Sequence, residues 1–159
     1  MATWMVRAGR KAVLFDSFID SGVATIGWGA LEGVRPDETV EQLRERVRQT
    51  WPNWHPQKVI MAASQVHRFA SDIMPGDTVV TYDPSQRVYR LGTTKGGYRF
   101  DPDFNHQDGG NIIDVDWGLE APRDALLTKT KNSRRHQHAL PHPRSCRAGP
   151  RTCGTRGKA

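Results

Sequence analysis

Cysteine is scarce in this chain: its 159 residues include only Cys146 and Cys153, both near the C-terminal end of the sequence. The rest of the chain therefore has no disulfide framework to support its fold. Long apolar runs are also missing, so we expect no membrane-spanning segment. Arg7, Arg10 and Lys11 come so early that the first residues do not resemble a signal peptide. These absences predict one soluble, cytoplasmic domain with a hydrophobic core of its own.

Acidic residues are missing from residues 129–159, although this stretch holds nine basic ones. The whole chain has 23 Lys and Arg against 17 Asp and Glu, a formal net charge of +6. Residues 1–128 hold the other 14 basic residues and all 17 acids, so they carry a net charge of about −3. Any affinity of this part for nucleic acid must therefore come from a local group of basic side chains rather than from the overall charge.

From residue 133 onward the regular spacing of apolar residues ends, and Arg, His, Pro, Gly and Cys predominate. Such a segment cannot bury enough apolar surface to offset its chain entropy. We therefore predict a folded domain over residues 1–132 and a disordered basic tail over residues 133–159. The histidines and cysteines of the tail fit no standard zinc spacing, and we predict neither a metal nor a cofactor. Because reading a GC-rich gene out of frame yields this kind of composition, our hypothesis is that the tail is a frameshift product or a degenerate end.

The apolar patterns of residues 1–132 predict an α+β fold. Alternating or β-branched runs indicate five or six strands, and apolar residues at helical spacing indicate two or three helices. Several short strands joined by tight turns favour a small curled barrel with the helices flanking it. The predicted strands are residues 3–8, 23–28, 78–82, 88–94, 96–102 and 111–117, and the predicted helices are residues 12–20, 38–50 and 57–72.

The order of several short motifs resembles the amino-terminal domain of Mrr-type restriction system proteins, which belongs to the EVE-like group of the PUA superfamily. The resemblance covers roughly residues 3–132, and the ordered set is more specific than any single motif. The matching segments are Trp4-Met5-Val6-Arg7-Ala8-Gly9, Ile26-Gly27-Trp28-Gly29, Gln65-Val66-His67-Arg68-Phe69, Pro75-Gly76-Asp77-Thr78-Val79-Val80-Thr81-Tyr82-Asp83-Pro84, Leu91-Gly92, Tyr98-Arg99-Phe100-Asp101-Pro102 and Val115-Asp116-Trp117.

The resemblance implies a PUA-like (EVE-like) mixed β-barrel that recognises nucleic acid. Relatives with this fold hold a flipped or single-stranded base in a pocket walled by aromatic rings, and many prefer modified bases. In the restriction proteins the domain precedes a separate nuclease domain. Since no Asp-x-Lys or Glu-x-Lys motif occurs in this chain, the resemblance implies the recognition domain alone, with no catalytic residues.

Two strand ends are the strongest candidates for a binding site. A strand that ends in a glycine turn lets the backbone come close to a ligand. The ring of Trp28 is left uncrowded by a glycine on each side, and stacking on such a ring is worth about 1–3 kcal/mol per base. The predicted base-binding residues are Arg7, Ala8, Gly9, Trp28, Gly29, Gln65 and Tyr98, and the predicted phosphate-binding residues are Arg10, Lys11 and Arg68.

Each candidate also has a plain structural interpretation. Arginines at a strand end are commonly solvated, a tryptophan on an apolar strand commonly belongs to a core, and polar residues on a helix commonly face water. For Trp51 and Trp54, which lie in a loop punctuated by prolines, a small satellite cluster is favoured over a ligand cage.

We therefore predict a non-enzymatic nucleic-acid recognition module of a restriction-type defence system. It would hold a flipped base, modified or plain, against Trp28 and the backbone of residues 7–9. DNA is favoured over RNA as the partner, a separate nuclease is a second expected partner, and no membrane is expected. The alternative is an orphan interaction or regulatory domain that binds a protein or a small metabolite.

Overall fold

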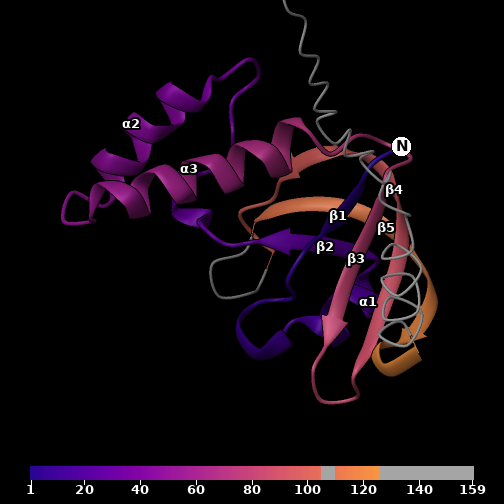
Figure 1. Ribbon diagram of the computed structural model, residues 1–159. Helices are drawn as coiled ribbons and strands as arrows, with labels where there is room; N and C mark the ends of the chain where they lie inside the picture. Colours follow the sequence, from indigo (N-terminus) through magenta and orange to yellow (C-terminus); the bar gives the residue numbers. More distant parts are fainter. Residues whose placement is uncertain (105–109, 126–159) are drawn as a thin grey trace, which may run out of the picture.

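The computed structural model describes residues 1–104 and 110–125 (Figure 1). They form an α+β fold: a five-stranded mixed sheet, three α-helices and two short 3₁₀ helices. The predicted tail and the predicted boundary at residue 132 lie outside the described residues. The elements in chain order are β1 (Thr3–Met5), η1 (Arg10–Ala12), α1 (Phe15–Ser21), β2 (Val23–Ile26), η2 (Gly29–Leu31), α2 (Val40–Thr50), α3 (Pro56–Ser71), β3 (Thr78–Asp83), β4 (Val88–Phe100) and β5 (Asn111–Pro122).

The sheet is open, with the strand order β1-β3-β4-β5-β2. β1 runs parallel to β3, and all other neighbours are antiparallel. Within the described residues no pairing joins β1 to β2, so the strands do not close into the predicted barrel. The helices α2 and α3 lie together and extend beyond one end of the sheet (Figure 1). Among the described residues, no helix combines the length and apolar composition needed to cross a membrane.

Most elements are close to their predicted positions, and the differences have local causes. The predicted strands 88–94 and 96–102 are one strand, β4, because its register with β5 shifts between Thr94 and Tyr98 and the two glycines between them accommodate the irregularity. The predicted helix 12–20 begins only at Phe15, since Lys11 and Ala12 have φ angles of 56° and 58°. Left-handed residues cannot continue a right-handed helix.

The predicted strand 3–8 ends at Met5, and the strand predicted to end at residue 117 continues to Pro122. The helices α2 and α3 begin at strong signals. Thr39 forms a capping box with Gln42 before α2, and Pro56 occupies the first turn of α3.

Two groups of buried apolar residues hold the fold together. The first, here called the sheet core, lies against the sheet and α1 and consists of Val6, Ala8, Phe15, Phe18, Ala24, Phe69, Ile73, Val79, Ile113 and Val115. The second, here called the helix core, lies among η2, α2 and α3 and consists of Leu31, Leu43, Val47, Val59, Ala62, Ala63 and Val66. Ile26, the last residue of β2, packs against both cores, so the chain passes from one to the other at this point.

One carboxylate adds to the backbone pairing of the short strand β1 with β3. Asp77 accepts hydrogen bonds from the amide of Ala2 (2.9 Å), the amide of Met74 (3.0 Å) and the indole Nε1 of Trp4 (2.9 Å). These donors, led by the Ala2 amide, hold the pKa of Asp77 below its ordinary value. The stabilisation that they give is therefore present above that ordinary value and is lost as the pH falls through the lower pKa of the folded state.

We expect Asp77→Asn to lower the melting temperature at neutral pH and to flatten its fall in acid, below about pH 4. Asp116→Asn is the control, because Asp116 is exposed and its nearest cation, Lys95 Nζ, lies 4.0 Å away. The measurement is thermal unfolding by circular dichroism at several pH values. An equally steep acid fall in Asp77→Asn and in the parent protein would contradict this role.

Gly92 lies where β4 and β5 come close together. A Cβ atom at this position would lie 2.5 Å from Val115 Cγ1 and 2.8 Å from the backbone oxygen of Asp116. At Gly97, on the same strand, a Cβ atom would meet nothing within 4 Å. The two glycines therefore differ in packing, although both lie in β4.

We expect Gly92→Ala to reduce the free energy of unfolding by about 1–3 kcal/mol, because the neighbouring backbone must shift to admit the methyl group. The matched change Gly97→Ala should stay within about 0.5 kcal/mol of the parent protein. Urea denaturation followed by fluorescence compares the two variants. Similar losses in both would show that the close approach at Gly92 does not govern stability.

Candidate functional site

The turn between β1 and α1 presents basic side chains on a fixed backbone. Gly9, with a φ of 73°, donates its amide to the oxygen of Arg7 (2.8 Å), and the amide of Leu14 bonds to the oxygen of Ala8 (2.9 Å). Ala8 is 1 % exposed and belongs to the sheet core. Ala8, predicted to bind a base through its backbone, is therefore buried as a whole, and its oxygen is occupied by Leu14. Arg7, Gly9 and the η1 residues Arg10 and Lys11 are all exposed.

Trp28 follows Ile26, the residue that packs against both cores, by two positions. Its backbone is left-handed, with φ 67° and ψ 32°, and its oxygen accepts the amide of Leu31 (3.0 Å) as η2 begins. The residue is partly buried and packs against the helix core. A left-handed conformation costs a residue other than glycine about 1–3 kcal/mol and persists only where the surroundings hold it. The partly buried Gly29 follows directly.

Hydrogen bonds from the sheet hold both ends of residues 27–34, here called the Trp28 loop. The hydroxyl of Tyr98 accepts the amide of Val34 (2.9 Å) and donates to Asn111 Oδ1 (2.7 Å). Asn111 Nδ2 donates to the oxygen of Gly27 (2.8 Å), and Asn111 is fully buried. Burial raises the pKa of Tyr98, so the hydroxyl keeps its proton. Tyr98 was predicted to bind a base. In the structure its hydroxyl bonds to the Trp28 loop and to Asn111, so Tyr98 positions the loop.

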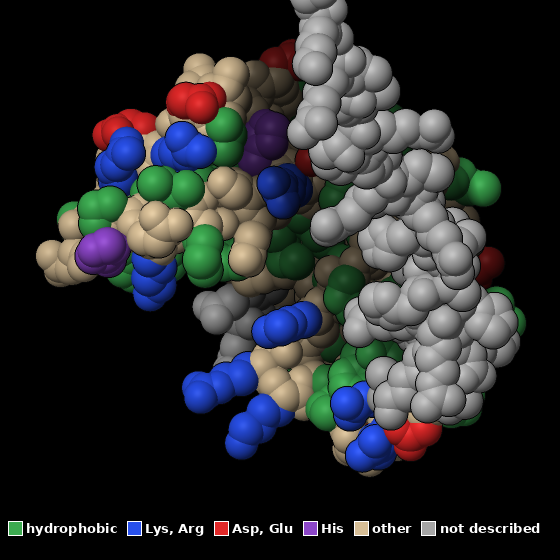
Figure 2. Space-filling view, in the orientation of Figure 1, with side chains coloured by type: hydrophobic (Ala, Val, Ile, Leu, Met, Phe, Trp, Pro, Cys, Tyr) green, Lys and Arg blue, Asp and Glu red, His purple; other side chains and the backbone are tan. Residues whose placement is uncertain are grey.

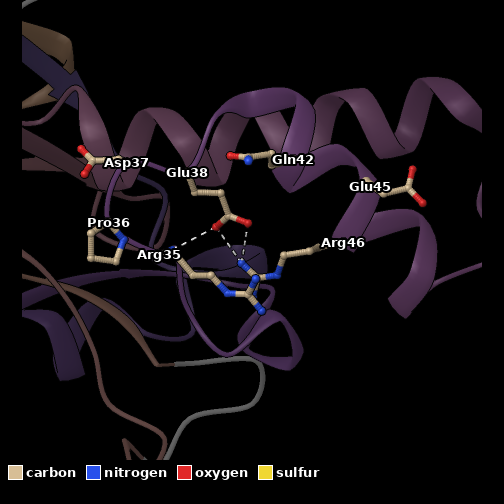
Figure 3. Close-up of a pocket in the computed structure, with 7 residues that line it drawn as sticks. All are labelled: Arg35, Pro36, Asp37, Glu38, Gln42, Glu45 and Arg46. Atoms are coloured by element: carbon tan, nitrogen blue, oxygen red, sulfur yellow. Dashed lines mark hydrogen bonds and ion pairs between the residues drawn. The ribbon is translucent and has the colours of Figure 1, made fainter.

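An arginine of α2 holds the middle of the same loop. Arg46 donates to the carboxylate of Glu38 at 2.7 and 2.9 Å, and to the backbone oxygens of Leu31 and Gly33. The amide of Arg35 also donates to Glu38 (3.0 Å). Glu38 and Arg46 face each other (Figure 3), and both line a cavity of about 380 Å³. Because this ion pair is internally satisfied, we interpret the cavity wall as a clamp on the Trp28 loop rather than as a binding site.

Sequence reasoning missed Asn111, Glu38 and Arg46. The sequence did contain a signal for Arg46. On α2 this residue follows the core residue Leu43 by three positions and directly precedes the core residue Val47. An arginine so close to the apolar stripe of a helix often has an internal partner. Asn111 begins a strand and carries no comparable signal.

Gln65 and Arg68 of α3 are exposed, as the plain interpretation of this helix face expects. No hydrogen bond, ion pair or ring contact in the described part of the chain joins either of them to Trp28. Their neighbour Phe69 packs edge-on against the ring of Tyr98, with centroids 6.3 Å apart and an interplanar angle of 88°. The helix is thereby tied to the residue that holds the Trp28 loop.

The basic residues divide into two groups. Within residues 1–104 and 110–125, Arg7, Arg10, Lys11 and Arg68 form no ion pair. Figure 2 shows Lys and Arg side chains gathered below α3. Figure 1 places the chain between β1 and α1 in the same region. The surface between this basic group and α3 is recessed (Figure 2). Seven other basic residues have acidic partners: Arg44, Arg46, Arg48, Arg87, Arg90, Lys95 and Arg99. Among the described residues, Arg35, Lys58 and Arg123 also form no ion pair; Lys58 Nζ lies over the Trp54 ring, and Arg123 donates to the Tyr82 hydroxyl (3.5 Å).

Residues 4–140 match a protein family described as a domain of unknown function, DUF8426. The chain belongs to this family. The DUF8426 match includes the turn after β1, the Trp28 loop and the whole of α3. Comparison with curated proteins gave no match, and comparison with solved structures gave none.

We expect Tyr98→Phe to reduce the free energy of unfolding by about 1–3 kcal/mol, because it leaves the buried Asn111 amide without one partner. Hydrogen exchange of the Trp28 loop should become faster, in particular at the amide of Val34. Tyr89→Phe is the matched control, since no hydrogen bond to the Tyr89 hydroxyl occurs among the described residues. Hydrogen–deuterium exchange with peptide-level readout compares the variants. Unchanged exchange in residues 27–34 of Tyr98→Phe would show that this hydroxyl does not hold the loop.

Proposed function

We propose that this protein is a non-catalytic nucleic-acid recognition domain. In this proposal Trp28 stacks on a base that has been flipped out or is single-stranded, and Arg7, Arg10, Lys11 and Arg68 contact phosphates. The observation that carries the proposal is that these four basic side chains lack acidic partners within the described residues. Residues 1–128 contain more acids than bases, so a lack of available carboxylates does not explain why the four stay unpaired. Exposed basic side chains without acidic partners suit a polyanion.

The setting of Trp28 supports the same proposal. An aromatic wall that is fixed before binding loses little conformational freedom when a ligand stacks on it. Tyr98, Asn111 and Arg46 fix the backbone on both sides of the ring. A base stacked on the ring would gain about 1–3 kcal/mol, which is comparable with the cost of taking it out of a duplex.

The finer fold assignment is also part of the proposal. We propose that the fold is an EVE-like relative of the PUA barrel; the ordered motifs over roughly residues 3–132 support this assignment. The preference for DNA, the restriction-type role, the modified base and the separate nuclease partner follow from this resemblance alone. The open sheet is the feature in which this chain departs from a closed barrel.

A second candidate function is the binding of a protein partner. Two large apolar side chains near the basic turn are strongly exposed, Met5 at 60 % and Val13 at 73 %. Exposed apolar residues beside charged ones are common in protein interfaces. This alternative predicts that removing the basic side chains leaves the interaction largely intact.

The test uses two variants with the same change in charge. The site variant replaces Arg7, Arg10, Lys11 and Arg68 by alanine. The control replaces Arg48, Arg87, Lys95 and Arg99, whose side chains are between 45 % and 61 % exposed and are ion-paired. Both variants keep residues 133–159, so any contribution of that segment is constant.

We expect the site variant to bind oligonucleotides at least tenfold more weakly. Its log–log salt dependence on a single strand should be shallower by about 0.7 for each phosphate that the protein no longer neutralises. Trp28→Leu, which keeps an apolar side chain against the helix core, should weaken binding by about 1–3 kcal/mol without changing that slope. Fluorescence anisotropy at several salt concentrations measures both quantities. Equal reductions of affinity in the site and control variants would refute the proposed site.

A further inference from the structure

The turn between α2 and α3 carries a layered arrangement of side chains that the proposed site does not use. The rings of Trp51 and Trp54 are stacked, with centroids 4.4 Å apart and an interplanar angle of 6°. Lys58 Nζ lies 3.8 Å from the centroid of the Trp54 ring. The flat indole of Trp54 therefore has Trp51 as its stacking neighbour and an ammonium group as a further contact.

The two indoles form a firm surface. Trp51 caps the C-terminal end of α2, and both rings pack against the helix core. Proline at position 56 opens α3, and His55 caps it by accepting the amide of Gln57 at its Nδ1 (3.3 Å). A stacking surface held in this way does not need to be ordered when a ligand arrives.

The lysine above Trp54 is easily displaced. Lys58 is exposed, and within the described residues it forms no ion pair. It also lies in the first turn of α3, where the helix dipole disfavours a positive charge. Since a base stacked on an indole is held more strongly than an exposed ammonium group, a base can take the place of the ammonium. The freed ammonium would then be able to contact a phosphate of the same strand.

Trp28 packs against the same helix core as Trp51 and Trp54. Figure 1 shows the chain after β2 below α3 and the α2–α3 turn at the outer end of that helix. Two indoles at separate positions would each need a base whose face is free. A duplex with a single flipped base offers only one such base, whereas a single strand offers one at each position.

We propose that Trp54 and Lys58 form a second nucleotide subsite, and that the ligand is a single-stranded nucleic acid which reaches from the turn after β1, past Trp28, to the α2–α3 turn. This inference rests on the proposed function and specifies its ligand. Trp28 holds one base, Trp54 holds another, and the basic side chains follow the phosphates between and beside them.

The experiment compares single strands of about 4 and about 12 nucleotides, lengths that bracket the reach of many small single-strand-binding domains. A duplex of the longer sequence with one mismatched base is the third probe. Lys58→Glu is paired with Lys95→Glu, which makes the same charge reversal at an exposed lysine on β4. Trp54→Leu removes the flat face, and its thermal unfolding is measured alongside because Trp54 packs against the helix core.

For the parent protein we expect the long strand to bind more tightly than both the short strand and the mismatched duplex. Lys58→Glu and Trp54→Leu should each weaken the binding of the long strand by about tenfold, whereas Lys95→Glu should not. Tighter binding of the mismatched duplex than of the long strand would overturn the inference. So would unchanged binding in Lys58→Glu, a variant whose exposed side chain has little part in folding.

The same measurements separate this inference from the proposed function. If Trp28→Leu weakens every probe while the Lys58 and Trp54 variants bind normally, the base site at Trp28 stands and the second subsite is refuted. If no probe binds the parent protein, both proposals fail. If the variants at residues 54 and 58 weaken binding while Trp28→Leu does not, the α2–α3 turn is the stacking site and the proposed role of Trp28 is wrong.

Discussion

The position of Trp28 depends on one buried amide, the side chain of Asn111. Its oxygen accepts the Tyr98 hydroxyl and its nitrogen donates to the oxygen of Gly27, so that adjacent strands and the Trp28 loop share one network. Asn111 is fully buried, and removing a partner would leave a polar atom without water. The loop must therefore keep its place for the network to stay satisfied. The left-handed backbone of Trp28 is maintained by this requirement and by the Arg46 clamp on the other side.

The same constraint adds to the contacts that join the two cores. The sheet core is built by strands, α1 and Phe69 of α3, whereas the helix core is built by α2, η2 and the rest of the buried face of α3. Ile26 packs against both, and the Trp28 loop begins directly after it. Phe69 connects α3 to Tyr98 by a contact between their rings. The three tryptophans that pack against the helix core thus lie on a support that is connected to the sheet by specific contacts rather than by a flexible hinge.

The electrostatic pattern is local rather than global. The overall charge is positive, yet residues 1–128 are slightly acidic. Seven basic residues of the described part are neutralised by partners, most of them on the surface of α2 and of the β4–β5 hairpin. Those near the turn after β1 and Arg68 are not neutralised within the described residues, and their field acts over about 10 Å at ordinary salt. The net charge of residues 1–128 would not attract an anionic ligand, so any attraction must come from these unpaired basic side chains.

Sequence alone determined the fold class, most helices and strands, the two helical apolar stripes and the exposed basic turn, because periodicity, capping residues and glycine turns are local signals. It also indicated which tryptophan would stand at a strand end. The tertiary structure alone decided that the sheet stays open and that residues 88–100 form one strand. It also decided that Tyr98 positions a loop and that Asn111, Glu38 and Arg46 hold it. Strand order, ion pairing and buried hydrogen bonds depend on residues far apart in the chain, and no local pattern records which of them will meet.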